Sequence, residues 1–171
     1  MTDPVSTRDE KFREIFSRYK NRTYDFALKM LGDRDAAGDV MQEVYLRLYQ
    51  ALESNRQFAD VQNWLFILTR NLCLNVIRDS GREVSLDKLV SDRQVDPEFA
   101  DAGLRKVKRA MAGLEPKYRE ALILKEYQGF SYEDIAGVLG ITVPAVRSLL
   151  YKARIKLKEN FEKLSIKRWS P

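Results

Sequence analysis

Residues 131–156 read SYEDIAGVLGITVPAVRSLLYKARIK, and this stretch has the spacing of two helices joined by a tight turn. Ser131, followed by the acidic residues Glu133 and Asp134, is a capping signal for a helix over 132–139. Gly140 permits the left-handed backbone that ends such a helix, and Thr142 can cap the next one. The apolar residues expected to pack the two helices together are Ile135, Ala136, Leu139, Ile141, Val146 and Leu150. The pattern predicts a helix-turn-helix.

The second of these helices carries the side chains that a DNA-binding surface needs. Those expected on its exposed face are Arg147, Ser148, Tyr151, Lys152 and Arg154. The first residues of such a helix reach base edges in a major groove, and the basic residues further along meet phosphates. An ordinary helical hairpin on a basic surface is the alternative interpretation. The capping signal, the glycine turn and the basic second helix together favour DNA binding.

Outward from this segment, the rest of the sequence is also helical in its apolar spacing and lacks strand-like alternation. A first helix is expected to begin near Thr7, which opens a T-x-x-E capping box, and to carry a polar break at Arg22–Thr23. Asp33 and Asp60 are the expected N-caps of two further helices. The fold class predicted is all-α.

The sequence divides into two small helical modules, at 7–79 and 98–164, joined by a flexible linker at 80–97 that lacks helical periodicity. Asp96 and Pro97 are expected to open the second module. Its first helix is predicted to turn four apolar residues inward, namely Leu104, Val107, Ala110 and Met111. No role is predicted for the tail 165–171.

The composition excludes several functions. The 171 residues contain no histidine and a single cysteine, Cys73. Without histidine, Ser–His–Asp and Cys–His catalysis are impossible, and a four-ligand structural zinc site cannot be built. One cysteine cannot form an internal disulfide, and Cys73 is expected to be a buried small hydrophobe. We therefore expect a protein that is not an enzyme and uses no metal and no cofactor.

Location and charge point the same way. No signal peptide is visible, and the longest apolar run, Trp64–Leu68, is far below the roughly 20 residues that span a membrane. The expectation is a cytoplasmic protein without membrane insertion of its own. The net charge is +5, and the last 31 residues hold 8 basic and 2 acidic side chains. A basic C-terminal block is typical of proteins that bind a polyanion.

Three segments in order resemble one family, the extracytoplasmic-function (group 4) bacterial sigma factors of the sigma-70 class. Residues 35–49 (DAAGDVMQEVYLRLY) resemble region 2.2 of that family, and residues 64–75 (WLFILTRNLCLN) resemble its W-L-x-x-x-x-R-N segment. Residues 114–158 resemble region 4. The resemblance covers about 9–79 and 98–163. It implies transcription initiation by promoter recognition, with core RNA polymerase and promoter DNA as partners and an anti-sigma factor as regulator.

The resemblance also implies roles for individual residues. The polymerase contacts would be the β′ coiled coil and the β flap, and the set implied for docking is Asp39, Gln42, Glu43 and Leu46. The residues implied for capture and opening of the −10 element are Phe58, Trp64, Arg70, Asn71 and Asn75. The residues implied for reading the −35 element are those of the basic helix: Arg147, Ser148, Tyr151, Lys152 and Arg154.

Two other functions stay open on the sequence. A stand-alone helix-turn-helix regulator would explain 115–160 and would bind duplex DNA without polymerase, but it leaves the first three helices without a role. A small helical hydrolase or transferase using Asp, Glu and Lys is a third possibility, although the sequence shows no convergent polar cluster. The sequence also leaves open whether the free chain is extended or compact, with its two modules folded together.

Overall fold

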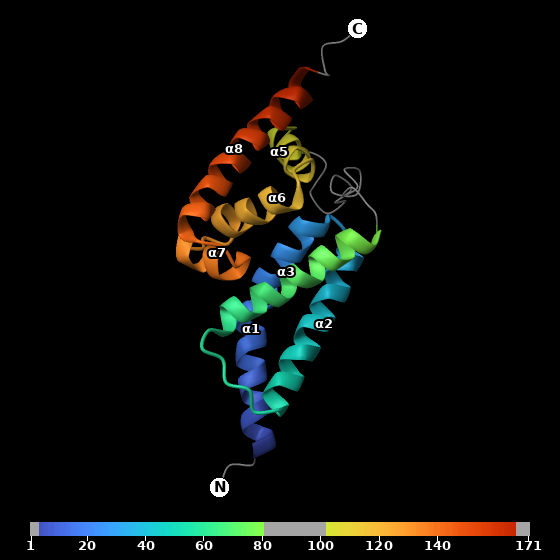
Figure 1. Ribbon diagram of the computed structural model, residues 1–171. Helices are drawn as coiled ribbons and strands as arrows, with labels where there is room; N and C mark the ends of the chain where they lie inside the picture. Colours follow the sequence, from blue (N-terminus) through green and yellow to red (C-terminus); the bar gives the residue numbers. More distant parts are fainter. Residues whose placement is uncertain (1–3, 81–101, 167–171) are drawn as a thin grey trace.

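The computed structural model describes residues 4–80 and 102–166, and every regular element in these two ranges is helical (Figure 1). The first range contains α1 (Pro4–Leu31), α2 (Arg34–Glu53) and α3 (Val61–Ser80). The second contains α5 (Ala102–Ala112), α6 (Pro116–Leu122), a π-helical turn η1 (Ile123–Tyr127), α7 (Tyr132–Leu139) and α8 (Val143–Ile166). The predicted all-α fold class is confirmed. The predicted linker beyond Ser80, the Asp96–Pro97 cap and the end of the tail lie outside the described residues.

Helix α1 differs from the prediction at its start and in its middle. It begins at Pro4, ahead of Thr7, and it continues through Arg22–Thr23 without a break. Thr23 is fully buried, and its hydroxyl donates to the Tyr19 carbonyl oxygen at 2.9 Å. The same hydroxyl lies 3.1 Å from the Tyr45 hydroxyl of α2. Because the polar group is satisfied inside the bundle, it does not end the helix.

The predicted caps of α2 and α3 are confirmed. The Asp33 carboxylate accepts the backbone N–H groups of Asp35 at 3.0 Å and Ala36 at 3.1 Å. Asp60 accepts the backbone N–H of Asn63 at 3.0 Å. These bonds satisfy donors that the first turn of a helix leaves unpaired.

The helix-turn-helix is also present as predicted. Ser131 and Asp134 form a reciprocal capping box at the start of α7, and Gly140 ends this helix with φ +67°. Ile135, Val146 and Leu150 are buried between the helices. Two expectations are wrong, because Ile141 is 37% exposed in the turn and Leu104 on α5 is 50% exposed. Both lie at helix ends, where periodicity does not say how far the packing partner extends.

A π-helical turn connects α6 to the helix-turn-helix, and nothing in the sequence analysis anticipated it. The backbone N–H of Gln128 donates to the Ile123 carbonyl oxygen five residues earlier, at 3.0 Å. Gly129 then adopts φ +68° and lets the chain turn toward α7. Single π turns within helices are found frequently at functional sites.

The N-terminal and C-terminal parts share one continuous apolar core. Phe26 of α1 and Phe66 of α3 lie edge to face at 5.7 Å between ring centroids, and Phe66 contacts Phe130 of the second part at 4.7 Å. Helix α7 packs on α3, and α6 and η1 touch α1 (Figure 1). The sequence left open whether the free chain is extended or compact, and in this structure it is compact, with the two modules packed together.

Candidate nucleic-acid and polymerase interface

The recognition helix α8 presents its predicted reading face to solvent. Arg147, Ser148 and Lys152 are exposed, and Tyr151 has 67% of its surface exposed. The opposite face of the helix carries Val146, Leu150 and Ala153, all buried. The packing therefore directs the basic side chains outward even though the chain is compact.

Arg154 is placed differently from the other residues of this set. It is exposed, but its Nη2 donates to Oε1 of Glu126 in the π turn at 2.7 Å. The hydrogen bond to Glu126 is the main reason why the pKa of Arg154 is raised. An exposed pair of this kind contributes little stability.

The stripe predicted for polymerase docking lies along the outer side of α2. Asp39 and Gln42 are exposed, and Leu46 has 52% of its surface exposed. Glu43 accepts a hydrogen bond from Nε of Arg47 one turn later, at 2.5 Å. The stripe thus presents one apolar side chain among polar ones; a single exposed leucine is ordinary at a protein surface, so its docking role stays a prediction.

The loop between α2 and α3 brings together two of the aromatic side chains predicted for −10 recognition. The rings of Phe58 and Trp64 lie 4.9 Å apart, and both side chains are half-buried. The guanidinium of Arg56 lies 5.8 Å from the Phe58 ring and 5.5 Å from the Trp64 ring. The sequence analysis missed Arg56. Its signal was a basic residue two positions before the aromatic in a polar loop.

The remaining predicted −10 residues lie on α3 and do not share one environment. Asn71 and Asn75 are exposed. Arg70 instead reaches across to α6, where Nε and Nη2 donate to the two carboxylate oxygens of Glu120 at 2.7 Å and 3.0 Å. The side chain of Glu120 is 3% exposed, and burial raises its pKa while Arg70 lowers it. In this arrangement Arg70 is occupied by the second module.

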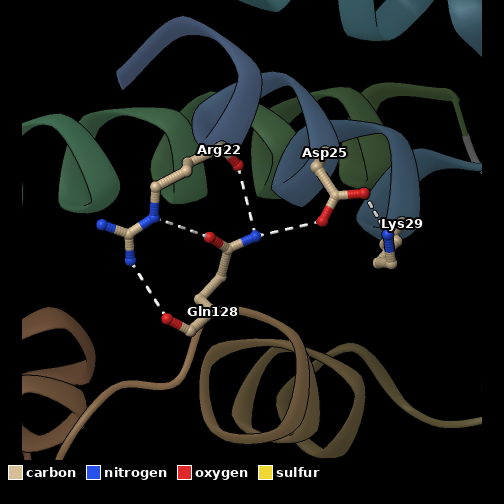
Figure 2. A network of polar contacts seen from close by, with 4 residues as sticks. All are labelled: Arg22, Asp25, Lys29 and Gln128. Carbon is tan, nitrogen blue, oxygen red and sulfur yellow. Dashed lines mark hydrogen bonds and ion pairs between the residues drawn. The ribbon is translucent and has the colours of Figure 1, made fainter. Parts of the chain in front are cut away.

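A second polar network joins the modules at the π turn (Figure 2). Arg22 of α1 donates from Nε to Oε1 of Gln128 at 3.3 Å and from Nη2 to its backbone oxygen at 3.1 Å. The Gln128 amide donates in return to the Arg22 carbonyl at 3.3 Å and to Asp25 at 3.1 Å. Lys29 also pairs with Asp25. These bonds fix the π turn against α1.

Arg119 forms a third connection, in the interior. It is 3% exposed and donates to the Met30 carbonyl at the end of α1 at 2.8 Å. It also donates to three carbonyl oxygens of its own module, those of Met111, Ala112 and Leu114. Burial lowers the pKa of Arg119 to about 10.

No group of three or more His, Cys, Asp or Glu side chains within 4–80 and 102–166 could hold a metal ion. No single helix in the described part of the chain is long and apolar enough to cross a membrane. Helices α7 and α8, which are bent by 94° at their turn, reach the length and apolar composition of a membrane span only when they are taken together.

Comparison with known proteins follows the same division of the chain. The family described as Sigma-70 region 2 matches residues 15–83, and the family described as Sigma-70, region 4 matches residues 104–157.

Individual relatives match over most of the chain. The ECF RNA polymerase sigma factor SigE of Mycolicibacterium smegmatis is 29% identical over 161 residues, which are 89% of this chain and 62% of that protein. The chain therefore spans less than two thirds of the length of this relative. SigM of Bacillus subtilis, also an ECF RNA polymerase sigma factor, is 30% identical over 150 residues, which cover 85% of this chain and 91% of SigM.

The compact arrangement is similar to a solved structure. The sigma factor RpoE of Bartonella quintana, crystallised with the anti-sigma factor NepR, has a TM-score of 0.70 and 26% sequence identity. The match covers 90% of this chain and 98% of that one. The two sigma-70 region families match in order, and SigM is 30% identical over most of both chains. The chain therefore belongs to the extracytoplasmic-function (ECF) family of RNA polymerase sigma factors.

Proposed function

We propose that this sigma factor divides promoter recognition between two modules, 7–79 and 98–164, and docks on core polymerase through α2. The observation that carries the proposal is the separation of three exposed surfaces on one chain: the α2 stripe, the aromatic loop before α3 and the basic face of α8. Sigma factors are non-enzymatic initiation factors, so none of these surfaces needs a catalytic group. The site of action is the cytoplasm, where the polymerase works.

The α2 stripe is proposed to bind the β′ coiled coil, with the second module on the β flap. Asp39, Gln42 and Glu43 supply polar contacts around Leu46, whose exposed surface provides the apolar centre. Protein interfaces commonly combine a small apolar centre with a polar rim.

The aromatic loop is proposed to hold a base flipped from the −10 element. Opening DNA costs a few kcal/mol for each unstacked base. Stacking on an aromatic side chain returns about 1–3 kcal/mol per base, and Phe58 with Trp64 supplies two rings at one site. Asn71, Asn75 and Arg70 lie further along α3 and are proposed to contact the unpaired strand.

The basic face of α8 is proposed to read the −35 element. Arg147 and Ser148 lie in the first turns of the helix, where base edges are reached, whereas Lys152 and Arg154 lie one turn later at the level of the phosphates. Tyr151 is the most exposed aromatic on this face and fits an apolar contact to a thymine methyl.

The compact arrangement is proposed to be the inactive form, controlled by an anti-sigma factor. The pairing of Arg70 with Glu120 withdraws one −10 residue, and the similar compact fold of RpoE was solved with an anti-sigma factor bound. Promoter binding would require the modules to separate and release Arg70.

Transcription with purified core polymerase on sheared genomic DNA tests the function. New discrete transcript starts that share two upstream elements, seen only when this protein is added, support it. No new starts, together with tight sequence-specific duplex binding by the protein alone, would favour the stand-alone regulator and remove the docking role from α2.

A further inference from the structure

Tyr132 lies at the centre of a group of basic side chains that join the two helices of the helix-turn-helix. The Arg147 guanidinium of α8 lies 5.6 Å from the centroid of the Tyr132 ring, and Lys125 Nζ of the π turn lies 4.7 Å from it. Tyr132 also helps to raise the pKa of Arg154, after the larger effect of Glu126. Two cations from two elements, Lys125 of the π turn and Arg147 of α8, therefore lie over one phenol ring.

The ring itself is held in a fixed position. Tyr132 is the first residue of α7, directly after the N-cap Ser131 and inside the capping box that Ser131 forms with Asp134, and its side chain is half-buried against the apolar core. Lys125 is fixed as well, since Nζ donates to the Phe130 carbonyl oxygen at 3.0 Å. Arg147 is exposed and makes no ion pair with any of the described residues, so its contact with the Tyr132 ring does not compete with a carboxylate there.

A guanidinium that rests on an aromatic face keeps its N–H groups free. The contact uses the π face of the group, whereas the N–H donors that recognise guanine lie along its edges. A free arginine side chain loses much rotamer freedom when it binds, and a side chain already held in one region loses less. The ring can therefore raise the affinity of Arg147 for a base without touching DNA.

We propose that Tyr132 is a positioning residue for −35 recognition, whose ring holds Arg147 ready to read one base pair. The inference rests on the proposed reading of the −35 element by α8. Tyr132 adds specificity at the position that Arg147 reads, and it does so through its ring rather than its hydroxyl.

The test compares Tyr132→Phe, which keeps the ring, with Tyr132→Leu, which fills similar space without one. Arg147→Ala identifies the base pair that Arg147 reads. Tyr118→Leu is the matched control, because Tyr118 is also a half-buried tyrosine with a lysine, Lys117, over its ring at 4.8 Å. Holoenzyme affinity is measured for the mapped promoter and for each single −35 substitution, and thermal unfolding checks the fold of each variant.

Tyr132→Leu is expected to lower the preference for the base read by Arg147 about two- to five-fold, the range of an exposed cation–π contact. Tyr132→Phe and Tyr118→Leu are expected to keep it. In the free chain, the side-chain protons of Arg147 should show an upfield ring-current shift by NMR that Tyr132→Phe keeps and Tyr132→Leu loses. The inference is overturned if Tyr132→Leu keeps the full preference, if affinity falls equally for every −35 sequence, or if the shift is absent. Absence of promoter-specific binding by the wild-type holoenzyme would instead overturn the proposed function itself.

Discussion

Arg70 and Glu120 form a two-pronged ion pair that joins α3 to α6 across 50 residues of sequence, with N···O distances of 2.7 Å and 3.0 Å. The two ends of the pair are unequally covered, since 22% of the Arg70 side chain is exposed but only 3% of that of Glu120. Burial raises the pKa of Glu120 more than Arg70 lowers it. The buried Glu120 carboxylate therefore needs Arg70 to compensate its charge, whereas the partly exposed Arg70 guanidinium can be hydrated without Glu120.

Arg70→Gln is expected to destabilise the contact between the modules more than Glu120→Gln does. The first change leaves a buried carboxylate without its cation, at a cost of about 3 kcal/mol, the lower end for a broken buried pair. The second removes the buried charge and leaves Arg70 partly hydrated. Urea unfolding measures stability, and small-angle X-ray scattering measures separation of the modules. Equal effects of the two substitutions would show that Glu120 does not need Arg70.

The same pair predicts a pH dependence with a definite sign. Because the pKa of Glu120 is raised in the folded chain, the cost of its charge is present at neutral pH and disappears as falling pH protonates it. The free energy of unfolding that Arg70→Gln loses relative to wild type is therefore expected to shrink as the pH falls from about 7 to about 5. This window lies above the pH at which an ordinary glutamate titrates. A deficit that grows on acidification would contradict this assignment.

Gly137→Ala tests the contact between α7 and α3. Within a helix, alanine is favoured over glycine by up to about 1 kcal/mol. A Cβ at position 137 would lie 3.1 Å from Nδ2 of Asn63, so Asn63 must move. Gly38→Ala on α2 is the matched control, since a Cβ there meets nothing within 4 Å. We expect Gly38→Ala to raise the melting temperature and Gly137→Ala to raise it less, because the Asn63 side chain must shift by a few tenths of an ångström. Equal gains in melting temperature would exclude a tight contact at Gly137.

Arg119 is expected to tolerate no substitution, including lysine. Its guanidinium serves four carbonyl oxygens from one position, three around the end of α5 and one at the end of α1. Lysine has three donors on a single nitrogen and cannot span them, so Arg119→Lys should cost about 2 kcal/mol or more. Arg78→Lys on the exposed Arg78–Asp79 pair is the control and should change stability little. Equal unfolding midpoints for the two variants would refute the role.

The sequence predicted the features that depend on near neighbours. The caps at Asp33, Asp60 and Ser131 and the turn at Gly140 need only residues within one turn of helix, so local pattern was sufficient. The break expected at Arg22–Thr23 is absent because the Thr23 hydroxyl is satisfied by the Tyr19 carbonyl and by Tyr45, which lies on another helix.

The contacts between the modules were beyond such reasoning. Arg70 and Glu120 are 50 residues apart, and Arg22 and Gln128 are 106 apart, with no spacing rule to connect them. The resemblance assigned Arg70 to DNA, and its ion pair with Glu120 became visible only in three dimensions. The π turn was also unpredictable, since 116–128 reads as one ordinary helix.

Cys73 predicts a fall in stability at alkaline pH. Burial, with a smaller effect from the charge of Glu120, raises the pKa of the Cys73 thiol to about 12. The unfolded thiol ionises near pH 8.5, so above that pH the unfolded state binds fewer protons and stability falls, by up to about 1.4 kcal/mol per pH unit. Cys73→Ala should remove this part of the slope between about pH 8.5 and about pH 10. The raised pKa values of Tyr45 and Tyr127 remain in both proteins and cancel in the difference. Equal slopes would mean that the thiol titrates normally in the folded chain.

The combined change Gln42→Ala with Glu43→Ala is expected to weaken binding to core polymerase about tenfold or more, at roughly 1 kcal/mol or somewhat less for each lost polar contact. The fold should survive, since both residues point outward from α2 and the Glu43–Arg47 pair is an exposed contact one turn apart. Gln50→Ala with Glu53→Ala is the matched control, because the same residue types are exposed two to three turns further along α2. Glu53 also pairs with Arg8 of α1 at 3.5 Å, so the unfolding of this control is measured alongside its affinity. Competition with a labelled sigma factor for core polymerase measures affinity, and circular dichroism confirms the helices. Wild-type affinity in the first pair would place the docking surface elsewhere, and equal losses in both pairs would mean that binding follows the general charge of α2 rather than the stripe around Leu46.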